Sequence, residues 1–306
     1  MARRPDSGTD ASTLAVDLNA DLGEGREPPA GQSAGGTPGD APSDHTTDVG
    51  LLRLVTTAHV ACGFHAGGPS VMRRTVAAAA AAGVEVGAHP SYPDVEGFGR
   101  RAMEQPPERM VDDVLYQVGA LMGVAGACGV TVRSVKPHGA LYHRMATDPQ
   151  CAAAVASAVL RLGEDLCLVV PAGSAAIAVA EGAGLRVVCE AFCDRGYRAD
   201  GTLVARGDPG SLLTDPNEAA GRALSLVTTG EVQTVEGSVV QLRCDTLCVH
   251  GDTPGAVAVA GAVRQALERT GIRVAPFTGP SALTVSAGDG PLVPRASTRG
   301  RVPWSG

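Results

Sequence analysis

Residues 14–24 read LAVDLNADLGE and residues 84–90 read VEVGAHP. Each stretch begins as a short, mostly apolar run and ends in acidic, amide or imidazole side chains. Such runs are typical of β-strands that are covered on both faces, as the strands of a parallel sheet are. In α/β barrels the residues at the carboxyl ends of the strands surround the active site. The two stretches therefore indicate a fold class and a position for a functional site.

The same pattern recurs along the chain. Seven strands are predicted at Leu14–Leu18, Ala58–Ala61, Val84–Ala88, Arg133–Lys136, Leu166–Val170, Arg186–Glu190 and Thr246–His250. Helices are predicted between them at Pro69–Ala82, Pro106–Cys128, Asp148–Gly163, Gly173–Gly182, Asp215–Thr229 and Pro254–Thr270. Alternation of this kind favours a parallel sheet with right-handed crossovers. No dinucleotide-binding or P-loop glycine motif is present, so a TIM-like (β/α)7 barrel is the predicted fold.

Three stretches fall outside this rhythm. Residues 1–12 and 279–306 are expected to be disordered termini around a single catalytic barrel domain at 13–278. Residues 25–45 form a Gly- and Pro-rich insertion directly after the first strand, where a barrel places a lid or a neutral loop. Residues 231–243 are predicted to form a small hairpin that turns near Glu236-Gly237.

Composition excludes several functions. A formal net charge of −7 argues against nucleic acid as a partner, and no apolar run reaches the roughly 20 residues of a membrane span. The first residues lead into no hydrophobic signal region, so a cytoplasmic protein is expected. The eight cysteines include no C-x-x-C pair and are interpreted as buried thiols rather than disulfides.

Polar residues gather at the predicted strand ends. Four of the seven histidines lie at or just past such an end, whereas His59 and His143 are interpreted as structural and His45 as a loop residue. The candidates for catalysis are Asp17, Lys136, His138, Glu190, Asp194 and His250. The candidates for substrate contact are Asn19, His65, His89, Arg100, Arg101, Arg195 and Asp252.

These residue types define a limited chemistry. Carboxylates and imidazoles supply general acids and bases, and Lys136, the single lysine in the chain, can hold an anion or stabilise charge on oxygen. Without a G-x-S-x-G elbow, hydrolysis of an amide-like bond by water is favoured over an acyl-enzyme. Asp17, His65 and His89 could also bind a divalent metal, and the metal requirement stays open.

Five motifs occur in order between Leu14 and Ile272: VDLNADLGEG, ACGFHAGGPSVMRRTV, GAHPSYPDVEGFGRR, VKPHGALYH and CVHGDTP. Together they resemble the LamB/YcsF family. The resemblance implies a barrel related to glycoside hydrolases and deacetylases. It also implies cleavage of 5-oxo-L-proline to L-glutamate, coupled to hydrolysis of ATP with Mg²⁺ and carried out with separate B and C subunits. The chain departs from the family pattern at His59, at Gly68 and in the long loop at 25–45.

Two other functions remain open. The same barrel and polar residues suit a metal-dependent deacetylase or carbohydrate hydrolase. A non-catalytic subunit that presents a small anion to a partner is the third possibility. Because no P-loop is present, the sequence leaves open whether ATP contacts this chain or a partner.

Overall fold

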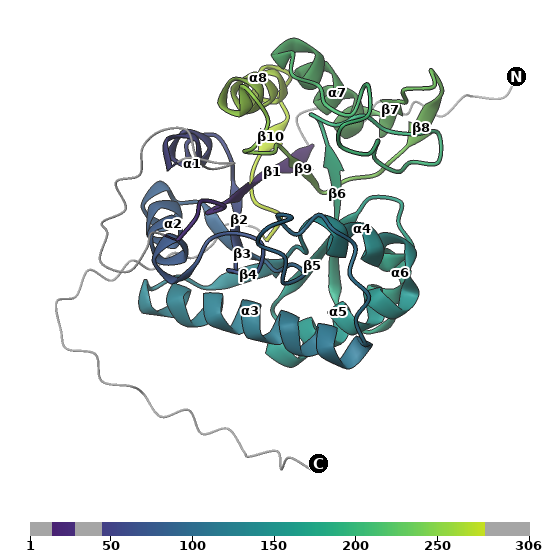
Figure 1. The fold of residues 1–306 in the computed structure, drawn as a ribbon. Coiled ribbons are helices and arrows are strands. Elements are labelled where there is room, and N and C mark those ends of the chain that lie inside the picture. The colour runs from purple at the N-terminus through teal and green to yellow at the C-terminus, as the bar shows by residue number, and fades with distance from the viewer. Residues whose placement is uncertain (1–13, 28–44, 279–306) are drawn as a thin grey trace, which may run out of the picture.

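The computed structural model describes residues 14–27 and 45–278, and within them seven parallel strands close into a barrel (Figure 1). Strands β1 to β6 pair in chain order, and β9 pairs with both β6 and β1. The strands are β1 (Ala15–Leu22), β2 (Thr57–Ala61), β3 (Glu85–His89), β4 (Val132–Val135), β5 (Cys167–Pro171), β6 (Arg186–Phe192) and β9 (Thr246–Cys248). All seven predicted strands and the TIM-like barrel are confirmed.

Helices surround this barrel on its outer face. They are α1 (His45–Leu52), α2 (Pro69–Ala82), α3 (Pro107–Ala127), α4 (Gly139–Thr147), α5 (Pro149–Leu162), α6 (Ala176–Gly182), α7 (Pro216–Thr228) and α8 (Ala256–Arg269). The six predicted helices are confirmed within a few residues. Asp148 and Asp215 cap α5 and α7 with their side chains, each followed by a proline in the first turn.

The sequence prediction missed three elements. Helix α1 begins at His45, interpreted from the sequence as a loop residue, and α4 begins immediately after the polar end of β4. The short strand β10 (Arg273–Val274) pairs in parallel with the start of β1. The predicted hairpin is confirmed as the antiparallel pair β7 (Glu231–Gln233) and β8 (Val239–Gln241). The termini and residues 28–44 of the predicted insertion lie outside the described residues.

Strand β1 explains why the barrel interior is polar. Its alternate residues Val16, Leu18, Ala20 and Leu22 are buried in the apolar core. Because side chains alternate across a strand, the other set, which is Asp17, Asn19 and Asp21, shares the opposite face and is equally buried. Barrel interiors of this type are normally filled by Val, Ile and Leu. A polar interior therefore points to function rather than to packing.

The first loop accepts hydrogen bonds from the free backbone N–H groups at the N-terminus of α2. Gly68 is the residue before the helix and has no side chain with which to cap it. Glu27 supplies the missing acceptor, because its carboxylate receives hydrogen bonds from the backbone N–H groups of Ser70 and Val71. A side chain at Gly68 would collide with Glu27, at 2.5 Å from its Oε2. An acidic residue from the neighbouring loop thus takes the place of a capping side chain at Gly68.

All eight cysteines are free thiols. Five are buried and three are partly buried, as predicted. Among the described residues, no helix combines the length and the apolar character that crossing a membrane requires.

Candidate active site

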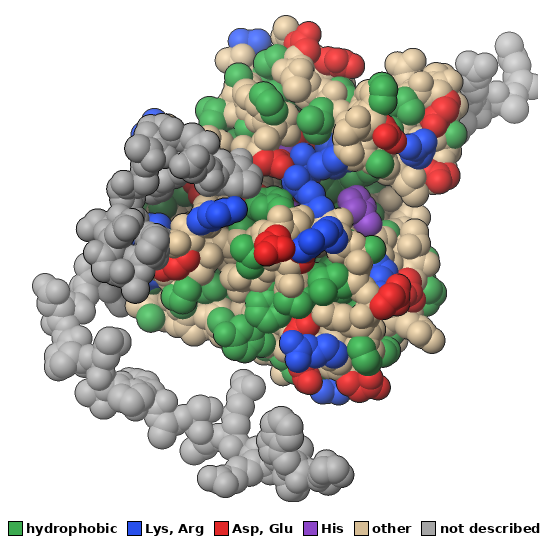
Figure 2. Space-filling view, in the orientation of Figure 1, with side chains coloured by type: hydrophobic (Ala, Val, Ile, Leu, Met, Phe, Trp, Pro, Cys, Tyr) green, Lys and Arg blue, Asp and Glu red, His purple; other side chains and the backbone are tan. Residues whose placement is uncertain are grey.

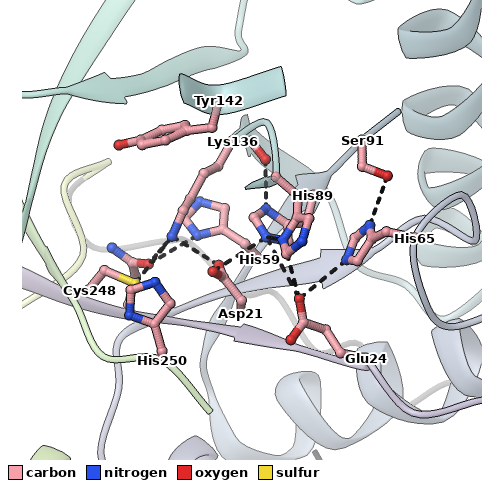
Figure 3. Close-up of polar contacts among 12 residues, drawn as sticks. Asp21, Glu24, His59, His65, His89, Ser91, Lys136, Tyr142, Cys248 and His250 are labelled. Atoms are coloured by element: carbon pink, nitrogen blue, oxygen red, sulfur yellow. Dashed lines mark hydrogen bonds and ion pairs between the residues drawn. The ribbon is translucent and has the colours of Figure 1, made fainter. Parts of the chain in front are cut away.

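Lys136 lies directly after β4 and is buried, with 2% of its surface exposed. Its Nζ lies 2.9 Å from Asp21 Oδ1 and 2.8 Å from Glu190 Oε1. It also donates to Asn19 Oδ1 and Cys248 Sγ, each at 3.2 Å (Figure 3). Burial alone would lower the pKa of Lys136, but the surrounding acidic groups hold it well above its usual value. The ammonium group therefore stays charged inside the barrel.

Glu190 is held from both sides of its carboxylate. Asn19 Nδ2 donates to Glu190 Oε1 at 3.0 Å, and Tyr142 Oη donates to Glu190 Oε2 at 2.6 Å. Asn19 also donates to Thr246 Oγ1 at 2.7 Å. Burial, followed by the nearby Glu190 carboxylate, raises the pKa of Tyr142 well above its usual value. Tyr142 therefore acts as a neutral donor that fixes Glu190 beside the ammonium group.

Asp17 lies deeper in the barrel than the sequence prediction placed it. Strand β1 continues four residues past the predicted end at Leu18, so Asp17 belongs to a lower layer. Its carboxylate accepts hydrogen bonds from the hydroxyl groups of Thr56, Thr57 and Thr246. Those contacts leave Asp17 outside the group around Lys136. We therefore transfer the role proposed for Asp17 to Asp21, four residues nearer the end of the strand.

The pH dependence of stability tests the buried state of Asp17. Burial raises its pKa from 3.8 to about 6, so the folded protein binds this proton more tightly than the unfolded chain. The contribution of Asp17 to stability is therefore full below 3.8 and is lost as the pH rises through about 6. It should be about 1.4 kcal/mol larger near pH 5 than near pH 7.5.

Asp17→Asn removes this titration. Denaturant unfolding of the wild type and of Asp17→Asn at the two pH values should show that their stability difference changes by about that amount. A difference that does not depend on pH would mean that the carboxylate is not desolvated as the structure indicates.

Three histidines converge on Glu24 at the ends of neighbouring strands, and Figure 3 labels two of them, His65 and His89. Glu24 Oε1 lies 3.2 Å from His65 Nε2, 3.5 Å from His138 Nδ1 and 3.9 Å from His89 Nε2. His89 Nε2 and His138 Nδ1 are 2.9 Å apart. The rings of His65 and His138 stack with centroids 3.9 Å apart. These four side chains have the geometry of a metal-ligand group, and all are buried.

Burial and neighbouring charges shift the pKa values of Glu24, His65 and His138 away from those of the same groups in water. Burial raises the pKa of Glu24 well above its usual value, and the nearby Asp21 and Asp252 raise it further. Burial also lowers the pKa of His65 and His138 well below the usual range for histidine. Neutral imidazoles are the form that binds metal ions.

His250 forms a second acid–base pair with Asp194. His250 Nδ1 lies 3.1 Å from both carboxylate oxygens of Asp194, and the backbone N–H of His250 donates to the same group at 2.9 Å. The ring stacks on Phe192 at a centroid distance of 5.3 Å. Burial would raise the pKa of Asp194, but the contacts with His250 lower it below its usual value. An anionic Asp194 orients His250 with Nδ1 as the donor, which leaves Nε2 available as a base.

Two arginines border the site. Arg100 Nη2 lies 2.5 Å from Asp252 Oδ2, and Arg206 Nη1 lies 3.2 Å from the same oxygen. Their side chains are partly accessible, at 36% and 25%. Arg100 also lies over the ring of Phe98, at 4.8 Å from its centroid. Figure 2 shows basic and acidic side chains gathered beside a hollow on the face in view.

Two predicted substrate contacts have other partners. Arg101 pairs with Asp94 and is 63% exposed, so it stabilises the loop after β3. Arg195 is buried and donates to the backbone carbonyls of Ser211 and Val204. Both guanidinium groups are occupied by loop contacts, and we therefore assign them to positioning rather than to substrate contact.

His59 lies inside the barrel, as a structural histidine would. Its ring nitrogens contact Asn19 Oδ1 at 3.3 Å and Ser134 Oγ at 3.2 Å. The neighbouring strand β3 carries Gly87 beside His59 in the pairing, and a Cβ atom there would lie 2.5 Å from the His59 ring. Burial lowers the pKa of His59 well below its usual value. The absence of a side chain at Gly87 thus makes room for a neutral imidazole that orients Asn19.

The structure brings most of the predicted residues to one end of the barrel. Sequence reasoning did not select Asp21 and Glu24, although both stand in the opening motif. The alternation from Val16 to Leu22 was the available signal, because it places Asp21 on the same face as Asn19. No local signal indicated Arg206 or Ser91, whose Oγ lies 3.0 Å from His65 Nδ1; both residues reach the site from loops.

The fold and the site together define a (β/α)7-barrel protein with buried acid–base groups at the carboxyl ends of its strands. Residues 16–282 match the model of the LamB/YcsF family, and the chain belongs to this family.

The alignments with similar proteins cover nearly the whole described part of this chain. A protein of Kocuria rhizophila, named as the A subunit of 5-oxoprolinase, is 50% identical over 262 residues, covering 86% of this chain and 98% of that protein. A Pyrococcus abyssi protein of the same name is 45% identical over 264 residues, with coverage of 86% and 98%. The crystal structure of a lactam utilization protein from Thermus thermophilus superimposes with a TM-score of 0.76 at 46% identity, covering 86% of this chain and 99% of that one.

Proposed function

We propose that this chain is the A subunit of an ATP-dependent 5-oxoprolinase, which opens the lactam ring of 5-oxo-L-proline to give L-glutamate. The names of relatives at 45% and 50% identity support this reaction. The observation that carries the proposal is Lys136, a buried ammonium group held between Asp21 and Glu190. Such a group, next to histidines and carboxylates, suits an anionic substrate with an amide bond.

ATP enters the proposal through the chemistry of the substrate. A five-membered lactam is unstrained and resists attack by water, so phosphoryl transfer to its carbonyl oxygen is a reasonable means of activation. The sequence has no P-loop. We therefore propose that separate B and C subunits work with this chain and that ATP is used with Mg²⁺ by the assembled enzyme. The assembly is proposed to be cytoplasmic.

The residues divide into three proposed roles. Lys136 stabilises negative charge that develops on the carbonyl oxygen. His250, oriented by Asp194, accepts a proton from the attacking water at Nε2. Arg100 and Arg206 hold the carboxylate of the substrate at the rim. Asn19 and Glu190 keep Lys136 in place, and Asp21 joins it to the histidines.

Reconstitution tests the proposed function. The purified chain, alone and with B and C subunits, is incubated with 5-oxoproline and ATP, and glutamate and phosphate are measured. Equal amounts of glutamate and phosphate formed only by the complete mixture support the proposal. Chelator-sensitive deacetylation by the lone chain would instead favour the metal-dependent hydrolase on the same barrel, to which the Glu24 and histidine group is suited. If 5-oxoproline binds but no mixture turns it over, the chain would be a non-catalytic subunit that presents a small anion to a partner.

Arg100→Ala is expected to raise KM for 5-oxoproline about 10- to 100-fold with a smaller change in kcat. This range corresponds to the loss of one charge-assisted hydrogen bond, roughly 1.5–3 kcal/mol. Arg109→Ala is the matched control, because Arg109 is 60% exposed on α3 and pairs with Asp113 on the same helix. Steady-state kinetics of the reconstituted enzyme should show no change for Arg109→Ala. An unchanged KM in Arg100→Ala would remove Arg100 from the substrate site.

A further inference from the structure

We infer that Glu24, His65, His89 and His138 form a binding site for one divalent transition metal, with zinc as the best match. The inference rests on the hydrogen bonds made by the outer nitrogen of each histidine ring. Those bonds decide which nitrogen carries the proton and therefore what faces the centre of the group.

Two of the rings donate outward to backbone carbonyls. His89 Nδ1 lies 2.7 Å from the carbonyl oxygen of Lys136, and His138 Nε2 lies 2.9 Å from the carbonyl oxygen of Phe98. A carbonyl oxygen can only accept, so each of these nitrogens carries the hydrogen. In the neutral rings, His89 Nε2 and His138 Nδ1 then carry no hydrogen, and each presents a lone pair. The two nitrogens nevertheless lie 2.9 Å apart.

The third ring is fixed through a serine. Ser91 Oγ donates its hydrogen to the carbonyl oxygen of Tyr92 at 2.8 Å. The same oxygen lies 3.0 Å from His65 Nδ1 and is left to accept from it. His65 Nε2 therefore also presents a lone pair, and it faces Glu24 Oε1 at 3.2 Å.

Three lone pairs and a carboxylate oxygen thus converge without a donor between them. A proton on Glu24 would serve only one of the three nitrogens. A metal ion satisfies all four atoms at once, and outward hydrogen bonds of this kind are the usual support of metal-bound histidines. Four ligands at zinc distances of about 2.0–2.1 Å in a tetrahedron are roughly 3.3 Å from one another. Four of the six separations here are 2.9, 3.2, 3.5 and 3.9 Å, and the ligand atoms of the four residues all lie within 4.8 Å of one another.

The backbone around the site is shaped to support it. Phe98 has φ of 53°, and it is the sole residue other than glycine with positive φ among residues 14–27 and 45–278. Such a conformation costs energy and tends to occur at functional sites. It directs the Phe98 carbonyl at His138. Gly99 follows with φ of 64°, and a Cβ atom there would lie 2.8 Å from the His138 ring.

A second group, Asp21, Cys248 and His250, also lies close together. There the ammonium of Lys136 already contacts Asp21 at 2.9 Å and Cys248 at 3.2 Å. The Lys136 ammonium group therefore already supplies the positive charge at that position. The group around Glu24 has no lysine or arginine in the equivalent place among the described residues, so the metal is assigned to it alone.

A metal at this position would take part in the proposed reaction. Its catalytic role therefore rests on the proposed function, whereas the binding of the metal does not. When bound, it would supply a Lewis acid for an oxygen of the substrate or of water. Asp21 Oδ2 lies 3.3 Å from His89 Nε2 and so joins the metal position to Lys136.

The test is metal binding by the isolated chain, without partner subunits or substrate. Protein stripped with a chelator is titrated with Zn²⁺ by calorimetry and with Co²⁺ by visible absorption, and metal content is measured by mass spectrometry. One ion per chain, a Co²⁺ spectrum typical of four-coordinate nitrogen and oxygen ligands, and a higher Tm with Zn²⁺ are expected.

Three variants make the test specific. His138→Gln should weaken binding at least about 100-fold, and Ser91→Ala, which frees the His65 ring, should weaken it about 10- to 100-fold. His143→Gln is the matched control, because His143 is exposed on α4 and should bind as the wild type does. A wild type that binds no ion, or a His138→Gln variant that binds as tightly as the wild type, would overturn the inference. Metal binding without glutamate formation in the reconstituted mixture would leave the metal site in place and reject the proposed reaction.

Discussion

Lys136→Met is expected to lower turnover of 5-oxoproline by the reconstituted enzyme about 100- to 1000-fold. The ammonium group is the one cation in contact with both Asp21 and Glu190 among the described residues, and the loss of such a stabilising group removes roughly 10²–10³ in kcat. The same change takes the one contacting lysine away from two buried carboxylates, which costs about 3–5 kcal/mol of stability. Loss of activity alone would therefore not separate chemistry from folding.

The double variant Lys136→Met with Glu190→Gln makes that separation. It neutralises one of the two buried carboxylates that have lost the lysine, and so it should recover part of the lost stability while remaining inactive. Arg109→Met, which removes an exposed cation on α3, is the matched control and should keep full activity. Thermal unfolding and coupled glutamate assays are the measurements. A folded double variant with wild-type turnover would show that Lys136 has no role in the reaction.

Asp21→Asn is expected to reduce kcat/KM about 100-fold or more, whereas Asp17→Asn should change it less than about fivefold. Both residues are buried aspartates on the same face of β1. Asp21 contacts Lys136 Nζ at 2.9 Å and His89 Nε2 at 3.3 Å, while Asp17 contacts threonine hydroxyls in the layer below. The pair therefore tests whether position along the strand decides function.

Kinetics and unfolding of the two variants should be measured together. Asparagine keeps the size of aspartate, so both proteins are expected to fold. If Asp17→Asn proved as inactive as Asp21→Asn, the lower layer would belong to the catalytic group, and the transfer of the role from Asp17 to Asp21 would be wrong.

Several parts of the site were predictable from the chain alone. Short apolar runs followed by polar residues predicted all seven barrel strands, because a strand covered on both faces has a local hydrophobic signature. The positions of His65, His89, Lys136 and His138 followed from the same rule, since each lies just past a strand or at its end. The single lysine was conspicuous against 24 arginines.

Other parts depended on distances that no local pattern contains. The four added residues of β1 moved Asp17 down one layer and brought Asp21 to Lys136, because a strand ends where its neighbours stop pairing with it. Arg101 and Arg195 were occupied by loop partners that lie 7 to 16 residues away in sequence.

The opening motif, with its alternation of apolar and acidic residues, determined by itself that a polar face would line the first strand. The closure of the barrel decided what that face meets, because β9 returns to β1 and sets Cys248, Glu190 and Lys136 opposite it. The protonation of the histidines likewise depended on tertiary structure, since the carbonyls of Lys136 and Phe98 and the hydroxyl of Ser91 come from separate segments. Local sequence sets which side chains share a face of a strand, whereas their partners across the barrel are set by how the strands pair.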